Sequence, residues 1–162
     1  RPEARMALGS LYMGRGNTEA AADAFQGALD ILSGPPPEGM NEEQVAGWAR
    51  DRPVAAFNAA QLTAESGDYD DAATILQGFL DNNAERLEPG TELRAKTALA
   101  GFLAQAGRDE EAEALYAEIG AREDLTSTEY FQIGIGLPQK RFREIAQSLA
   151  PSSHFPKRPV RT

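Results

Sequence analysis

The chain has 162 residues, a formal net charge of −9, no cysteine and a single histidine, His154. That length suffices for one domain with a sizeable core, or for a short array of repeats that share one core. The lack of cysteine and of further histidines excludes a thiol nucleophile, a disulfide framework, a structural zinc site and a multi-histidine metal centre. We therefore expect no metal and no cofactor.

The charge is unevenly distributed. Residues 1–137 carry ten Arg or Lys against 24 Asp or Glu, whereas residues 138–162 carry six basic residues against one acidic residue. An acidic body repels nucleic acid, so we expect a protein or peptide partner and no nucleic acid. No apolar run reaches the roughly 18 to 20 residues that a membrane span needs, so no membrane insertion is expected. The chain starts at Arg1 without an initiator Met, and we expect it to belong to a longer or processed protein; the sequence does not indicate the compartment.

The first predicted element is a helical hairpin over residues 2–33. Its two Ala-rich runs meet at Arg15-Gly16-Asn17, where Gly16 suits a left-handed helix end and Asn17 suits the cap of the next helix. A run of three prolines at 35–37 cannot continue that second helix. Residues 34–51 are therefore predicted to form an insert between hairpins.

Within and after the insert, an amphipathic stretch starts at Asn41 and carries Val45 and Trp48. Pro53 predicts either a kink or a fresh helix start, for which Asp51 is a plausible cap. A second hairpin is expected over 52–86, with Gly67 in its turn.

Two further hairpins are predicted. The first of them spans residues 91–121 and turns at Gly107, and Thr91 is expected to cap its first helix after the break at Pro89. Asp109 is expected to cap its second helix, as Asp68 does in the preceding hairpin. Residues 126–150 contain a degenerate fourth pair, because a solenoid must cover its last apolar face. Residues 151–162 read as a basic, Pro-containing tail, so the domain is expected to span 1–150.

The three turns define a repeat. After each turn a small residue (Ala21, Ala72, Ala112) is followed one turn later by a large one (Phe25, Leu76, Tyr116). These positions, with Leu8, Gly9 and Tyr12, resemble the tetratricopeptide repeat over roughly residues 2–121. The resemblance implies an all-α fold, a TPR-like α-solenoid of three to four helical hairpins in a right-handed superhelix; a related α-solenoid is the main rival. The glycine spacings of 51 and 40 exceed the family period of about 34, so the array is irregular.

The resemblance also implies a binding site. In this family the first helices of successive hairpins line a concave groove that takes an extended peptide or a partner helix. The positions carried over from the family are Met6, Ser10, Met13, Phe57, Asn58, Gln61, Glu65, Arg94, Thr97 and Gln105. For Met6 and Phe57 a place in the core is an equal alternative. Only Asn58 and Arg94 match the five-residue clamp with which some members grip chaperone C-termini, so we predict no such binding.

No catalytic centre is indicated. The carboxylates lie where they complement helix N-termini, and His154 stands in the predicted tail, so the chain is expected not to be an enzyme. The expected function is a scaffold that binds a partner protein. One alternative is an accessory, substrate-positioning segment of a larger and enzymatic protein. Another is self-association through the stretch around Val45 and Trp48 or through residues 131–137.

Overall fold

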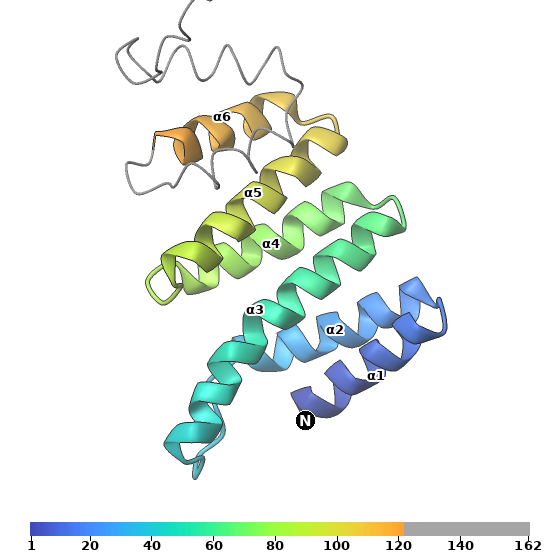
Figure 1. Cartoon of the computed structure of the whole chain (residues 1–162), viewed down its shortest axis with the longest axis vertical. Coiled ribbons are helices and arrows are strands. Elements are labelled where there is room, and N and C mark those ends of the chain that lie inside the picture. The colour runs from blue at the N-terminus through green and yellow to red at the C-terminus, as the bar shows by residue number, and fades with distance from the viewer. Residues whose placement is uncertain (122–162) are drawn as a thin grey trace, which may run out of the picture.

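The computed structural model describes residues 1–121, which form six α-helices and no strands. The helices are α1 (Pro2–Gly14), α2 (Thr18–Ser33), α3 (Glu42–Glu65), α4 (Tyr69–Asn83), α5 (Pro89–Gln105) and α6 (Asp109–Gly120). Each packs mainly on its neighbours in sequence, so the three hairpins stack in chain order from α1 to α6 (Figure 1). This confirms the predicted all-α solenoid of helical hairpins. The fourth pair at 126–150 and the tail at 151–162 lie outside the described residues.

The three hairpin turns have the predicted glycine geometry. Gly16, Gly67 and Gly107 have φ angles of +71°, +93° and +78°, a region that side chains with a Cβ avoid. Asn17 caps α2, since its side chain accepts a hydrogen bond from the Ala20 amide. Asp68 occupies the cap position of α4 without a side-chain bond.

Two predicted caps differ from the structure. Asp109 is the first residue of α6 rather than its cap, which is Arg108, so the Asp109 carboxylate acts at the positive end of the helix instead of capping it. The helix α5 begins at Pro89, two residues before the expected cap Thr91. Proline fits the first turn because its missing N–H would have no partner there and its φ is already helical.

The helix α3 is longer than the second hairpin needs. Asn41 and Gln44 form a capping box at its start, and the helix continues through Pro53, so Asp51 lies inside it and is not a cap. The sequence allowed either a kink or a fresh helix start at Pro53. The structure has one continuous helix there, which changes direction along its length (Figure 1). The first third of α3 therefore extends beyond the hairpin stack, where the sequence predicted an insert.

Close helix contacts form the core. The buried residues are mostly alanines and leucines, and the ring of Phe25 on α2 packs directly against Gly9 on α1. The buried Trp48 of α3 donates from Nε1 to the carbonyl oxygen of Leu32 (3.2 Å) at the end of α2. The first contact holds α1 against α2, and the second attaches the end of the first hairpin to α3.

Candidate binding surface on the odd-numbered helices

The ten residues predicted to bind lie on the odd-numbered helices, and we call them the odd-helix surface. Met6, Ser10 and Met13 are on α1; Phe57, Asn58, Gln61 and Glu65 are on α3; Arg94, Thr97 and Gln105 are on α5. Apart from the adjacent pair Phe57 and Asn58 and the eight-residue step from Thr97 to Gln105, they recur every three or four residues, so those of each helix share one side. The helices α3 and α5 also contact each other directly, which brings their parts of the surface together.

The clearest contact across this surface joins α3 to α5. The Arg94 guanidinium carbon lies 4.4 Å from the centre of the Phe57 ring, within the range of a cation–π interaction. The Phe57 ring in turn lies 6.3 Å from that of Phe79 on α4, with the planes inclined by 57°. Because Arg94 is exposed and rests on a ring that is itself packed, its charge is held at a fixed place.

The apolar residues of the odd-helix surface fall into two groups that differ in exposure. Met6 and Phe57 are half-buried and pack against the core, and each keeps some exposed surface. Met13 is 46 % exposed. The surface thus offers apolar area next to a fixed cation.

Several hydroxyl and amide side chains of the odd-helix surface donate hydrogen bonds to backbone carbonyls of their own helices. Ser10 donates to the Met6 carbonyl, Asn58 to that of Val54 (2.8 Å) and Thr97 to that of Leu93 (2.8 Å). Such bonds fix the rotamers, and each side chain keeps acceptor capacity that a ligand N–H could use. Gln61 donates to Glu65, but at 3.4 Å that bond is long.

Val54 was not among the predicted residues. It is 46 % exposed and precedes Phe57 by about one helical turn on α3. The signal was in the sequence, because Val54 precedes Arg94 by 40 residues, the same interval as Gly67 to Gly107. Val54 therefore occupies in the second hairpin the position of Arg94 in the third.

A partly buried polar network joins α2, α3 and α4. Arg52 donates from Nε to the Leu32 carbonyl (2.7 Å) and from Nη1 to Asn83 Oδ1 (2.8 Å); Asn83 donates to the Phe79 carbonyl (2.7 Å). Burial, and then the neighbouring positive charge of Arg86, lower the pKa of Arg52. The network places a cation at the C-terminal ends of α2 and α4, where the helix dipoles favour it.

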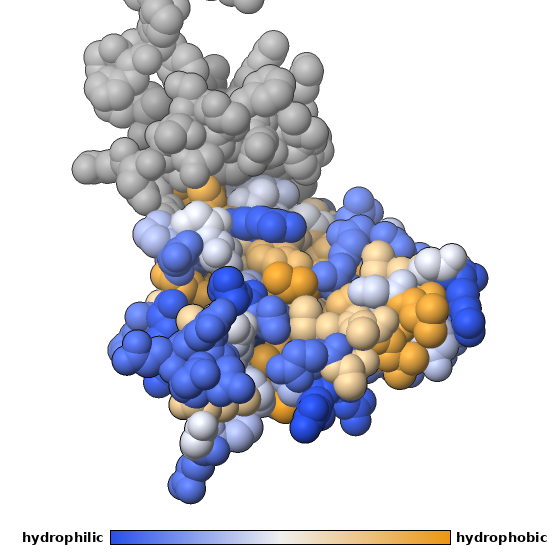
Figure 2. Space-filling model, turned by 60° about the horizontal axis from the view of Figure 1, so that its bottom comes forward, coloured by the Kyte–Doolittle hydropathy of each residue, from blue (hydrophilic) through white to orange (hydrophobic). Residues whose placement is uncertain are grey.

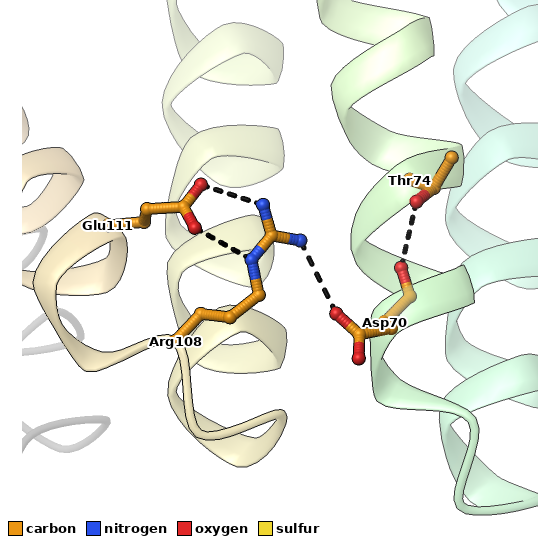
Figure 3. A network of polar contacts seen from close by, with 4 residues as sticks. All are labelled: Asp70, Thr74, Arg108 and Glu111. Atoms are coloured by element: carbon orange, nitrogen blue, oxygen red, sulfur yellow. Dashed lines mark hydrogen bonds and ion pairs between the residues drawn. The ribbon is translucent and has the colours of Figure 1, made fainter.

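The junctions between successive hairpins differ in charge. At the junction of the second and third hairpins Arg108 pairs with Glu111 (2.7 Å) and reaches Asp70 of α4 (3.3 Å), whose carbonyl accepts a bond from Thr74 (Figure 3). The hydrogen bonds that Arg108 donates to Glu111, and then to Asp70, raise the pKa of Arg108 above its ordinary value. The ion pairs are exposed, so they stabilise this junction only weakly.

At the junction of the first and second hairpins, the residue at the Arg108 position is Asp68. Here the corresponding surface is a cleft of about 480 Å³, and among the described residues that line it there is no Arg or Lys. Its carboxylates are those of Glu19, Asp23, Asp68 and Asp71. The first junction therefore concentrates negative charge where the second has an ion pair.

Within residues 1–121 no helix is long and apolar enough to cross a membrane, and no group of three or more His, Cys, Asp or Glu side chains is placed to hold a metal ion. No curated protein matches the chain. The family model described as "Tetratricopeptide repeat" matches residues 1–36 and 50–124, leaving out the loop after α2 and the first part of α3. These ranges cover more than half of the chain and include all three hairpins, so the chain belongs to the tetratricopeptide repeat family, whose members are generally protein–protein interaction modules.

Proposed function

We propose that the odd-helix surface binds an extended segment or a helix of a partner protein, and that the chain itself carries out no reaction. The observation that carries this proposal is the pairing of Arg94 with Phe57: an exposed cation fixed on an aromatic ring, beside the exposed apolar side chain of Val54.

A peptide would meet complementary groups there. A carboxylate or a main-chain carbonyl of the peptide can accept from the Arg94 guanidinium, and a main-chain N–H can donate to the Asn58 amide oxygen. An apolar peptide side chain can cover Val54 and the exposed edge of Phe57. Because Arg94 is already positioned by its ring contact, less side-chain entropy is lost on binding than for a free arginine.

The test uses a random peptide library displayed on phage, selected on the 162-residue chain. Peptides enriched over several rounds are then measured by fluorescence polarisation against the double variant Asn58→Ala, Arg94→Glu. We expect at least a tenfold loss of affinity, while the melting temperature stays within a few degrees, since both side chains are at least partly exposed.

The matched control is Arg86→Glu, the same charge reversal at an exposed position between α4 and α5, outside the odd-numbered helices. It should leave the affinity unchanged. If the enriched peptides bind the double variant as tightly as the original chain, the odd-helix surface is not the site.

A further inference from the structure

Gly101 leaves a gap in the odd-helix surface. It lies inside α5, 91 residues after Ser10 and 40 residues after Gln61, so the repeat register places it on the same surface as those two side chains. A Cβ built on Gly101 would lie 4.0 Å from the Tyr116 hydroxyl oxygen, and outside the adjoining backbone of α5 no other described atom lies within 4 Å. The fold therefore has room for a side chain where the sequence has none.

Packing does not explain this glycine. Glycine in a helix interior is less favourable than alanine, because it loses more backbone freedom on folding. Gly9 on α1 has a packing reason, since the Phe25 ring occupies the place of its side chain. At Gly101 the distance of 4.0 Å is an ordinary contact, so an alanine would fit. Because Gly101 is only half-buried, the glycine instead gives a ligand close access to the α5 backbone.

The Tyr116 hydroxyl stands at this gap without a partner. The side chain of Tyr116 on α6 is 2 % exposed, and within residues 1–121 its hydroxyl makes no hydrogen bond, whereas a buried tyrosine usually has one. In this part of the chain the polar side-chain atom that is both fully enclosed and unbonded is Gln26 Oε1, so the tyrosine hydroxyl reaches solvent. A hydrogen-bond donor on a rigid, packed ring is therefore available beside Gly101.

The two ends of the odd-helix surface differ in character. Figure 2 shows hydrophobic residues gathered at the end of the molecule where α1 lies, and Met13 of that helix is an exposed apolar member of the surface. Within α5, all of which the structure describes, no large hydrophobic residue is exposed. The α1 end thus suits apolar side chains of a bound segment, and the α5 end suits its polar main chain.

We propose that the partner segment is extended where it passes α5, that its main chain lies directly over Gly101, and that one of its carbonyl groups accepts a hydrogen bond from the Tyr116 hydroxyl. This inference rests on the proposed function and decides between its two kinds of ligand. An extended segment leaves its carbonyls free to accept. A helix bonds its carbonyls internally, and its side chains hold its backbone away from the surface.

The test uses the peptides enriched from the displayed library, measured by fluorescence polarisation on the 162-residue chain. Gly101→Ala fills the gap and should weaken binding at least tenfold, although it should raise the melting temperature because alanine favours the helix. Tyr116→Phe removes the donor and should weaken binding about fivefold, as expected for one neutral hydrogen bond. In the Gly101→Ala background the tyrosine change should have no further effect, since the added methyl already separates the peptide from the hydroxyl.

The matched control for the glycine is Gly78→Ala. Gly78 lies inside α4, where a Cβ would meet nothing within 4 Å, so this change should also raise the melting temperature but leave the affinity unchanged. Tyr69→Phe, on the same even-numbered helix, is the control for removal of a hydroxyl and should leave the affinity unchanged as well.

The double variant Asn58→Ala, Arg94→Glu separates this inference from the proposed function. If that variant loses affinity while Gly101→Ala or Tyr116→Phe binds as the original chain does, the inference is wrong and the proposed function stands. If none of these variants loses affinity, the odd-helix surface is not the site, and both are overturned.

Discussion

The contact between Gly9 and Phe25 gives a quantitative test of how closely α1 and α2 pack. A Cβ added at Gly9 would lie 2.7 and 2.8 Å from two carbons of the Phe25 ring, roughly 0.8 Å inside an ordinary carbon–carbon contact of about 3.5 Å. The ring is 3 % exposed, so it has little room to move away. Gly9→Ala should therefore incur an overpacking cost of about 1–3 kcal/mol.

The same change also favours the helix, because alanine in a helix interior is about 1 kcal/mol better than glycine. Gly78 isolates this gain, since it lies inside α4 and a Cβ there would meet nothing within 4 Å. We expect Gly78→Ala to raise the free energy of unfolding by about 0.5–1 kcal/mol, and Gly9→Ala to fall about 1–3 kcal/mol below it. Urea unfolding followed by circular dichroism measures both. If Gly9→Ala stabilises the chain as much as Gly78→Ala does, α1 and α2 are not packed as described.

Three further predictions concern stability. Arg52→Met removes the donor to Leu32 and Asn83, and should lower the free energy of unfolding by about 1–3 kcal/mol in urea; no change would mean that the network does not fix the helix ends. Asp68→Arg places a cation next to the acidic cleft at the first junction, as Arg108 does at the second, and should raise the melting temperature at low salt, with the gain shrinking in 1 M salt. Burial raises the pKa of Tyr116 above 10.0, so its neutral form is favoured in the folded chain; the contribution of Tyr116 to stability should be constant below about pH 10 and fall above it, and Tyr116→Phe should reduce that fall. An equally steep fall in the phenylalanine variant would contradict the last of these.

The hairpins could be predicted from the sequence because their signals are local. A glycine that must take a positive φ, as at Gly16, Gly67 and Gly107, and an asparagine directly after it, as at Asn17, constrain the backbone wherever they stand. The repeated order of small and large residues then fixes which helices pack together.

The features that were missed depend on contacts between distant segments. Arg52 has no carboxylate partner in its network; it bonds to a carbonyl at Leu32 and an amide at Asn83, and neither pairing leaves a pattern in the sequence. The same network, with Trp48, attaches the part of α3 just before Pro53 to the end of α2. Tertiary contacts there outweigh the local preference of proline.

For the odd-helix surface, the residues could be proposed from the repeat register, but their arrangement could not. Arg94 and Phe57 are 37 residues apart, and their ring contact follows from how α5 lies against α3. Val54 is the opposite case, because its place in the repeat, 40 residues before Arg94, is enough to locate it from the sequence.

The most direct test of the odd-helix surface is a map of where a selected peptide binds. Amide chemical shifts of the isotopically labelled chain are recorded during titration with the tightest peptide from the displayed library. We predict that the largest changes fall on the residues around Phe57 and Gln61 of α3 and around Arg94 and Thr97 of α5. Largest changes on α2, α4 and the acidic cleft between them, with α3 and α5 unaffected, would contradict the assignment of the binding site.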